Sequence, residues 1–241
     1  MTVPEKDLET AREKVKSSRS VVVLSGAGIS SESGVPTFRG SGGLWQGRRA
    51  EELATPEAFE SEPKLVWEFY DWRRSVLKEV KPNPGHFALA ELEKLKKDFT
   101  LITQNVDGLH EEAGSKNILE LHGNIWHLKC TVCNAKSRNT DVPISILPYC
   151  ECGGLLRPDI VWFGESLDEN ILNKAFSKCS SCDIMFVVGT SAVVQPAASL
   201  GPLAKRGGAF VIEINPEPTP LTDAVDLAIT GKSGEILPQL I

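Results

Sequence analysis

Four cysteines in the middle of the chain have a spacing that suits a metal site. They form two close pairs sixteen residues apart: Cys130, Cys133, Cys150 and Cys152. Four thiolates match the tetrahedral coordination of zinc and leave no ligand position open, so such a site is structural. Cys179 and Cys182 are a rival second pair, but they come where a helix precedes an apolar run and small apolar residues are expected. We therefore favour the first four.

Short polar segments follow six apolar runs of the sequence. The runs are Val21–Leu24, Phe99–Thr103, Ile118–Leu121, Ile184–Val188, Ala209–Ile214 and Leu227–Thr230. The segments after them are Gly26-Ala-Gly28, Gln104-Asn-Val-Asp107, His122-Gly123, Gly189-Thr-Ser191, Asn215 and Gly231-Lys-Ser233. If the runs are parallel strands, these segments meet at the carboxyl edge of one sheet, where such folds bind ligands.

The segment Gly26-Ala-Gly28-Ile-Ser-Ser31 follows a strand and opens a predicted helix. Glycines let a backbone approach a pyrophosphate, and a helix N-terminus offers free N–H groups. Ser31 stands where the usual dinucleotide fingerprint has a third glycine, so the match is weak on its own. A tight strand–helix turn is the alternative interpretation.

Among the histidines, His122 alone stands at the carboxyl end of a strand, and it is our candidate for a base near neutral pH. His86 at a helix start is expected to pack or cap, His110 to face partner side chains, and His127 to precede the cysteine loop. A buried core histidine remains an equally good interpretation of His122 from its position alone.

Other polar residues have both a functional and a structural interpretation. Asp107 is a candidate for catalysis or a helix cap, and Asn105 for catalysis or a turn. Tyr70 and Arg73, three residues apart in the helical stretch 63–80, share one face. Spacing alone favours a solvated arginine beside an aromatic core residue.

The elements that position these residues alternate between strand and helix. The six apolar runs are nearly continuous and rich in β-branched residues, which is typical of strands buried on both faces. Helices are predicted at the N-terminus around Leu8, Ala11 and Val15, over 84–97, and after Ser166 with a Ser-x-x-Glu capping box. The pattern predicts an α/β fold with a sheet of mostly parallel strands.

Two segments interrupt the alternation and predict a smaller second domain. Residues 35–97 are rich in Gly, Pro and Trp and then helical, and 126–158 contain the four cysteines. We expect these two segments to form a helical module and a zinc module. The sheet domain then comprises 1–34, 98–125 and 159–241.

Composition narrows the function classes. The 241 residues include 26 basic and 32 acidic ones, and a net charge of −6 does not favour a nucleic-acid binder. No apolar run approaches the roughly 18–20 residues that span a bilayer, and the charged N-terminus does not resemble a secretory signal. We expect a cytoplasmic monomer that binds neither membrane nor nucleic acid.

The motifs together resemble the sirtuins, the NAD-dependent protein lysine deacylases. The matching stretches are GAGISSESGVPTFRG (26–40), TQNVDGLHEEAG (103–114), LHG (121–123), LLRPDIVWFGE (155–165), VVGTSAVVQPAA (187–198) and EIN (213–215). The resemblance extends over nearly the whole chain, and only the short spacing of Cys150 and Cys152 departs from the commoner one. It implies a Rossmann-type domain, a small zinc-binding domain, and NAD with an acyl-lysine peptide between them.

The resemblance also implies roles for single residues. Its cofactor-binding residues are Gly26, Ala27, Gly28, Ile29, Ser30, Glu32, Pro36, Thr37, Phe38, Arg39, Trp45, Gln104, Asn105, Val106, Asp107, Gly189, Thr190, Ser191, Asn215, Pro216, Glu217 and Ser233. Its catalytic residues are His122, Asn105 and Asp107, with His122 as the base. Val161, Trp162, Phe163, Gly164 and Glu165 resemble the strand to which the substrate peptide adds by main-chain hydrogen bonds. NAD is consumed, giving nicotinamide and O-acyl-ADP-ribose, and zinc takes no part.

One subgroup of sirtuins carries Tyr and Arg on a helix lining the acyl channel and prefers succinyl, malonyl or glutaryl groups. Tyr70-Asp-Trp-Arg73 matches that pattern, and a guanidinium with a phenol suits a carboxylate. The resemblance therefore implies a desuccinylase or demalonylase. The alternatives are a deacetylase, a protein ADP-ribosyltransferase, or a module that binds NAD or acyl-lysine without catalysis.

Overall fold

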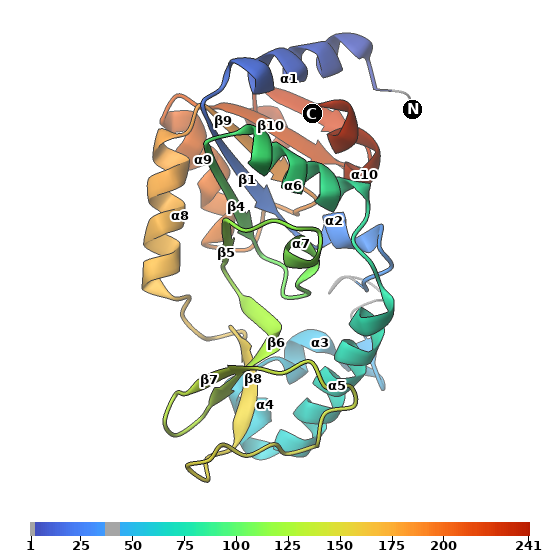
Figure 1. Cartoon of the computed structure of the whole chain (residues 1–241), viewed down its shortest axis with the longest axis vertical. Coiled ribbons are helices and arrows are strands. Elements are labelled where there is room, and N and C mark those ends of the chain that lie inside the picture. Colours follow the sequence, from blue (N-terminus) through green and yellow to red (C-terminus); the bar gives the residue numbers. More distant parts are fainter. Residues whose placement is uncertain (1–2, 37–43) are drawn as a thin grey trace.

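A six-stranded parallel sheet forms the centre of the larger domain (Figure 1). The computed structural model describes residues 3–36 and 44–241. The strands of the sheet are β1 (Ser20–Ser25), β4 (Asp98–Thr103), β5 (Ile118–Glu120), β9 (Ile184–Val188), β10 (Phe210–Asn215) and β11 (Leu227–Thr230). Their order is β11-β10-β9-β1-β4-β5, and every pairing is parallel. Each strand matches one predicted run to within a residue at either end.

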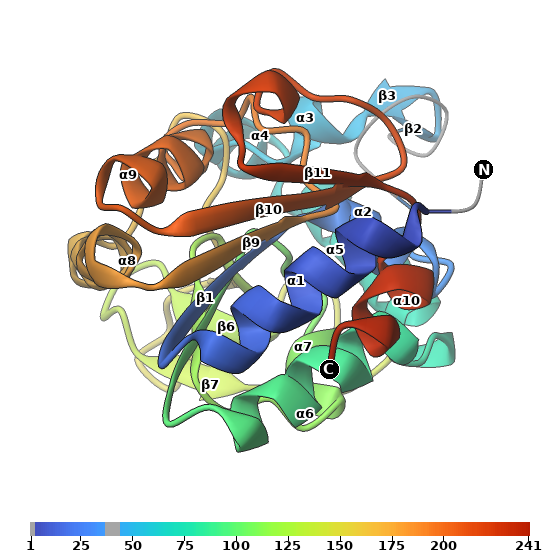
Figure 2. The same cartoon turned by 90° about the horizontal axis from the view of Figure 1, so that it is seen from above.

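Helices cover both faces of this sheet (Figure 2). One face packs against α1 (Glu5–Ser17), α6 (Pro84–Leu95) and α10 (Ser233–Ile236), and the other against α8 (Glu169–Ser181) and α9 (Leu200–Arg206). Alternate residues of β1 point to opposite faces of the sheet. Val21 and Val23 pack on the side of α1, α6 and α10, and Val22 and Leu24 pack on the side of α8 and α9. Burial on both faces explains why the strands are continuous apolar runs.

The remaining elements are short or belong to the small domain. The helices are α2 (Ala27–Ser31), α3 (Ala50–Leu53), α4 (Pro56–Ser61), α5 (Pro63–Glu79) and α7 (Leu109–Glu112), with 3-10 turns at Ala197–Ser199, Thr222–Ala224 and Leu237–Gln239. A two-stranded sheet joins β2 (Leu44–Trp45) and β3 (Arg48–Arg49). A three-stranded antiparallel sheet has the order β7 (Lys136–Arg138), β6 (Gly123–Cys130), β8 (Leu156–Ile160).

The three predicted helices are present as α1, α6 and α8, and α6 begins at Pro84 as predicted. Helix α1 buries Leu8, Ala11 and Val15, as its spacing predicts. The capping box predicted at Ser166 is wrong, because α8 begins at Glu169 and its N-cap is Asp168. The Asp168 carboxylate accepts from the N–H groups of Asn170 and Ile171 and takes the role that we assigned to the serine.

Helix α5 docks through one of its faces on the cysteine-containing sheet and on the loop that follows β7. The indole N–H of Trp67 donates to the carbonyl of Leu156 in β8 at 2.9 Å. One turn later the Asp71 carboxylate accepts from the N–H of Ile144 at 2.7 Å. The Arg74 guanidinium then donates to the side-chain oxygen of Asn139 at 2.6 Å. Residues 67, 71 and 74 follow helical spacing, so a single stripe of α5 anchors it.

The packing of α6 differs from the predicted domain boundaries. Ala88, Leu89 and Leu92 of this helix belong to the core of the large sheet, whereas the sequence analysis placed 84–97 in the small domain. The core of the small domain instead combines residues from α3 to α5 with residues of β6 and Trp162. We propose a boundary before Asn83.

Among the described residues, no helix is long and apolar enough to cross a membrane.

The backbones of two loops touch where the strand order reverses, between β1 and β9. The N–H of Gly28 donates to the carbonyl of Gly189 at 2.7 Å. A Cβ on Gly28 would lie 2.7 Å from the Cα of Gly189, and Gly189 itself has a φ of +57°. Both positions therefore require glycine, and the reversal point is where open sheets of this kind bind ligands.

We expect Gly28→Ala to destabilise the protein by about 1–3 kcal/mol, because its methyl group meets backbone atoms that cannot rotate away. Chemical denaturation of the variant and the parent measures this difference. Gly153→Ala, where a Cβ meets nothing within 4 Å but φ is +83°, is the control for backbone strain without a clash. A loss for Gly28→Ala no larger than that of the control would contradict the close approach.

Candidate functional site

Hydrogen bonds connect the segments that follow β1, β4 and β9. The Asn105 amide donates to the carbonyl of Gly26 at 3.1 Å and to the Ser30 hydroxyl at 3.0 Å. The Gln104 amide donates to the Thr190 hydroxyl at 2.9 Å. Segments far apart in the sequence thus share one edge of the sheet, as the strand pattern predicts.

A cavity of about 220 Å³ opens beside this network. Its lining consists of Gly28, Ser31, Glu32, Gly189, Ile214, Pro216, Lys232 and Ser233. The Glu32 carboxylate accepts from the Ser233 hydroxyl at 2.7 Å and from the N–H of Gly234 at 3.0 Å, which joins α2 to α10. The cavity floor is the glycine contact described above, so a ligand can approach the backbone closely.

The donors around the cavity fit a dinucleotide such as NAD. The glycines at the start of α2 let a pyrophosphate approach the backbone, where the helix N-terminus favours negative charge, and Lys232 adds a positive charge at the cavity wall. The predicted cofactor-binding residues do not include Ser31, Ile214 and Lys232, although Ser31 and Lys232 lie in segments that the sequence analysis placed at the ligand edge. Each of the three lies next to or close to a predicted residue in the sequence. The polar segments that follow the strands therefore indicate which residues line the cavity.

The other residues predicted to bind the cofactor differ in burial and in the domain to which they belong. Ser30 and Ile29 are buried beneath the cavity, and the Asn215 amide donates to the carbonyl of Glu217 at 3.0 Å. Trp45 packs in the small-domain core, where its ring lies 5.7 Å from that of Phe69 between centroids. Ala27, Pro36, Val106 and Ser191 lie in the described segments around this edge. Thr37, Phe38 and Arg39 lie outside the described residues.

His122 directly follows the carboxyl end of the β5 run and is half-buried. Its Nδ1 lies 2.9 Å from the carbonyl oxygen of Gln104. A carbonyl can only accept, so in the neutral ring Nδ1 carries the proton and Nε2 has the free lone pair. Burial lowers the pKa of His122 below its usual value, with the carbonyl contact opposing. The arrangement is that of a neutral imidazole able to accept a proton at Nε2.

Asp107 is buried between the two domains. Its carboxylate accepts from the N–H of Leu109, the first residue of α7, at 2.9 Å, but Gly108 and not Asp107 occupies the N-cap position of that helix. Burial raises the pKa of Asp107, while the bonds from Leu109 and Ser30 and the charge of Arg73 oppose the rise. The indole N–H of Trp126 donates to the Asp107 carbonyl at 2.9 Å and ties it to β6.

The segment Val161–Glu165 is attached to the backbone of His122. The N–H of Val161 donates to the His122 carbonyl at 3.0 Å, and that of Phe163 donates to the carbonyl of Ala54 at 2.9 Å. Trp162 is buried, whereas Phe163 is 50% exposed and Gly164 is also exposed. The segment thus bridges the sheet domain and α3, with its tip at the surface.

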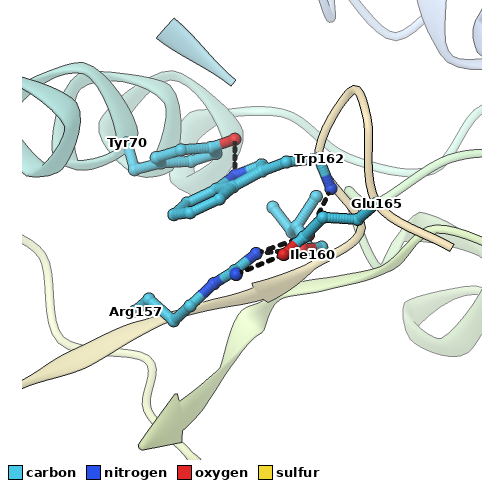
Figure 3. Close-up of polar contacts among 5 residues, drawn as sticks. All are labelled: Tyr70, Arg157, Ile160, Trp162 and Glu165. Atoms are coloured by element: carbon cyan, nitrogen blue, oxygen red, sulfur yellow. Dashed lines mark hydrogen bonds and ion pairs between the residues drawn. The ribbon is translucent and has the colours of Figure 1, made fainter. Parts of the chain in front are cut away.

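Arg157 holds this segment in a closed turn (Figure 3). Its guanidinium donates to both oxygens of Glu165 at 2.6 and 2.8 Å and to the carbonyl of Ile160 at 2.8 Å. The bonds from Arg157 lower the pKa of Glu165 against the effect of burial. Although Arg157 lies in a quoted motif, sequence reasoning did not assign it a role, because a pair eight residues apart has no periodic signature.

Tyr70 and Arg73 are both buried, so the interpretation of a solvated arginine is wrong. Arg73 is 8% exposed, and its guanidinium carbon lies 5.8 Å from the Phe69 ring centroid. Burial lowers the pKa of Arg73, while the charges of Tyr70 and Asp107 oppose the shift. Burial raises the pKa of Tyr70 to about 12. The pair therefore presents a cation and a neutral phenol near Asp107.

The other histidines have structural partners. His86 completes a capping box with Asn83 at the start of α6, as predicted. The Nε2 of His110 lies 2.9 Å from the Ser25 hydroxyl, and the ring centroids of His86 and His110 lie 4.8 Å apart. His127 lies in β6 before the cysteines. Burial lowers the pKa of both His86 and His110, so they are neutral at pH 7.

The four predicted cysteines converge in space. Their sulfur atoms all lie within 4.8 Å of one another. Cys130 and Cys152 are 3.5 Å apart, and Cys133 and Cys150 are 3.7 Å apart. Thiolates bound to zinc at about 2.3 Å stand about 3.8 Å from each other in a tetrahedron. The cluster therefore fits a structural zinc ion, and the shorter second spacing does not prevent convergence.

Cys179 and Cys182 lie elsewhere. Both are buried in the core between the large sheet and α8, and the thiol of Cys182 points to the carbonyl of Cys179. Within the described ranges they belong to no metal-ligating group. This outcome agrees with our preference for the first four cysteines.

We expect Cys133→Ala to reduce the zinc content from about one ion per chain to a small fraction, because the remaining three thiolates bind far more weakly. Metal analysis of the purified protein measures this, and thermal unfolding should show a destabilised small domain. Cys179→Ala is the matched control and should keep its zinc. Full zinc retention by Cys133→Ala would show that the cluster is not the metal site.

Comparisons with known proteins agree with this geometry. Residues 26–196 match the model of the Sir2 family. An "NAD-dependent protein deacylase" of Pyrococcus furiosus is 53% identical over 240 residues, covering 97% of this chain and 96% of its own. A crystal structure of a Sir2 homolog–NAD complex superposes with a TM-score of 0.92 at 48% identity, covering 96% of this chain and 91% of that one. Sir2Af2 bound to a myristoylated histone peptide gives a TM-score of 0.80 at 36% identity, covering 98% of this chain and 95% of that one.

The family match covers more than half of the chain, and the relatives align over nearly their whole length. The sheet order, the glycine contact and the cysteine cluster are the features that such a fold requires. This protein belongs to the Sir2 family.

Proposed function

We propose that the protein is an NAD-dependent protein lysine deacylase that prefers succinyl- and malonyl-lysine to acetyl-lysine. Its products would be the free lysine, nicotinamide and O-acyl-ADP-ribose. The deacylase activity is supported by the curated relatives, which are named for it, and by the cavity that suits NAD. The acyl preference is supported by the buried pair Tyr70 and Arg73.

We assign NAD to the edge that carries the glycine contact. The α2 N-terminus and Lys232 suit its phosphates, and Ser233, which the resemblance assigns to the adenosine half, lines the same cavity. The nicotinamide half would then reach toward Gln104, Asn105 and Asp107, which lie beyond β4. NAD supplies the electrophilic ribose carbon and the leaving group, and the protein must position them.

His122 is the base in this proposal. Its Nδ1 is held by the Gln104 carbonyl, which aims Nε2 away from the backbone as the proton acceptor. Because the ring is neutral at physiological pH, it can take a proton from a ribose hydroxyl without first losing its own. Asn105 and Asp107 orient the reacting groups from the neighbouring loop.

The peptide would bind along Val161–Glu165. The exposed side chain of Phe163 and the exposed Gly164 mark an accessible part of this segment. Main-chain pairing there reads the backbone, so peptides of different sequence can bind. The histone peptide complex of Sir2Af2 supports an acylated peptide as the substrate class.

The buried guanidinium of Arg73 carries the acyl preference. A guanidinium presents a planar set of N–H donors, which can form charge-assisted hydrogen bonds with the carboxylate of a succinyl group. The phenol of Tyr70, protonated at neutral pH, can add a second hydrogen bond. An acetyl group offers neither interaction. Deacetylation and protein ADP-ribosyl transfer are the competing activities, and product analysis by mass spectrometry distinguishes them.

We expect His122→Ala to lower the deacylation rate by roughly 10²- to 10⁴-fold, the usual cost of losing a general base. NAD binding, measured by calorimetry, should be largely retained. Because the pKa of His122 is lowered by burial and the neutral ring is the active form, the acid limb of kcat/KM in the parent should fall below pH 6.5. A midpoint above that value would contradict a buried neutral base.

We expect Arg73→Met to reduce kcat/KM for a succinyl-peptide by roughly ten- to a hundredfold, as one or two charge-assisted hydrogen bonds are lost. The value for the acetyl-peptide should change little or rise. Lys78→Met, which removes an exposed charge from the same helix, is the control and should alter neither. Equal losses on both peptides would mean that Arg73 supports the helix and does not select the acyl group.

A further inference from the structure

The hydroxyl of Tyr70 has a specific neighbour in the peptide-binding segment. The indole N–H of Trp162 lies 2.8 Å from the Tyr70 oxygen, and both side chains are at most 3% exposed (Figure 3). The two rings are stacked, with centroids 6.4 Å apart. A residue of the predicted acyl pair is thus joined directly to the segment that we assign to the peptide.

The direction of this hydrogen bond follows from chemistry. An indole nitrogen is only a donor, so the Tyr70 oxygen must accept, and the phenol's own proton is not used in the bond. The bond also restricts rotation of the hydroxyl, because the oxygen must keep a lone pair toward the indole. Tyr70 can therefore still donate its own O–H, in a direction that the bond from Trp162 limits. An ionised carboxylate only accepts hydrogen bonds, so it is a suitable partner for that O–H.

The indole is itself held in place from several sides. The Arg157 guanidinium lies 3.4 Å from its ring centroid, within the range of a cation–π contact. Glu165 accepts from Arg157 and from the backbone N–H of Trp162 at 2.8 Å. The Phe59 ring of α4 packs 5.2 Å away. Because these contacts do not involve Tyr70, they set the indole position independently.

We propose that Trp162 is a positioning residue for acyl selection, which directs the Tyr70 hydroxyl as a hydrogen-bond donor toward the carboxylate of a succinyl or malonyl group. This inference rests on the proposed function. It adds that the selectivity depends on a third residue, located in the peptide-binding segment and acting through Tyr70. Arg157 and Glu165 keep the indole oriented.

A double-mutant cycle tests whether Trp162 acts through Tyr70. Trp162→Phe keeps an aromatic ring but removes the N–H, so kcat/KM for a succinyl-peptide should fall about three- to tenfold, mainly through a higher KM. Because Trp162 lies in the peptide-binding segment, the acetyl-peptide value should also fall, but by a smaller factor, so that the ratio of succinyl to acetyl kcat/KM decreases. In the Tyr70→Phe background, the same substitution should have little further effect on succinyl-peptide. Losses that multiply independently would overturn the proposal.

Trp67→Phe is the matched control, because its indole also donates one buried hydrogen bond from α5, to Leu156 at 2.9 Å. It should destabilise the protein without changing the ratio of succinyl to acetyl activity. If Trp162→Phe fails to fold, a second measurement takes its place. NMR then follows the hydrogen-exchange rate of the Trp162 indole N–H in the parent and in Tyr70→Phe. Faster exchange than in the parent supports the bond, and an unchanged rate overturns it.

The outcomes separate this inference from the proposed function. A parent enzyme without succinyl preference overturns both. A preference that depends on Arg73 but survives in Trp162→Phe overturns only the role of Trp162. Equal losses on the two peptides in Trp162→Phe would show that the indole supports peptide binding in general, and would also overturn it.

Discussion

The parallel pairing of β1 with both β4 and β9 is the constraint on which the site depends. Ser25, the last residue of β1, is in register with Thr103 on one side and Val188 on the other. The next residues along each strand, Gly26, Gln104 and Gly189, therefore emerge at one level. A shift of one residue in either pairing would turn the side chains of that strand to the opposite face. Because alternate residues of β1 pack against different helices, such a shift would disrupt the packing on both faces.

The small domain contributes Tyr70 and Arg73 to the site through helix α5. The stripe of Trp67, Asp71 and Arg74 fastens α5 to the cysteine-containing sheet and to the loop that follows β7, and Tyr70 and Arg73 lie between these anchors along the helix. A zinc ion in the cluster would stabilise that sheet and hence the platform of α5.

The sequence was sufficient to predict the parallel sheet and the cysteine cluster. The apolar runs are unambiguous because burial on both faces removes alternation, and the polar residues after them mark the ligand edge. The position of α6 was not predictable in this way, because its stripe of Leu89 and Leu92 fits equally well against a sheet or another helix. Ser166 was a plausible cap by pattern, but the nearby Asp168 competes for the same N–H groups, and only geometry decides between them.

Side-chain partnerships between distant segments were the least predictable part of the site. Nothing in the spacing of Tyr70 and Trp162, 92 residues apart, indicates a hydrogen bond between them. The sequence indicated which segments carry candidate site residues. It did not predict that Arg73 is buried, because this burial depends on how α5 docks. Periodicity describes one element at a time, whereas burial of a charge depends on every element around it.

In our proposal, the groups that perform the reaction are separate from those that select the acyl chain. His122 is oriented by the Gln104 carbonyl, and its own carbonyl holds Val161, so backbone atoms fix the base relative to the peptide-binding segment. Acyl selection in our proposal depends instead on the side chains of Tyr70, Arg73 and Trp162. Because backbone bonds persist when side chains change, substitutions at these three positions can alter the preferred acyl group while leaving the base in place.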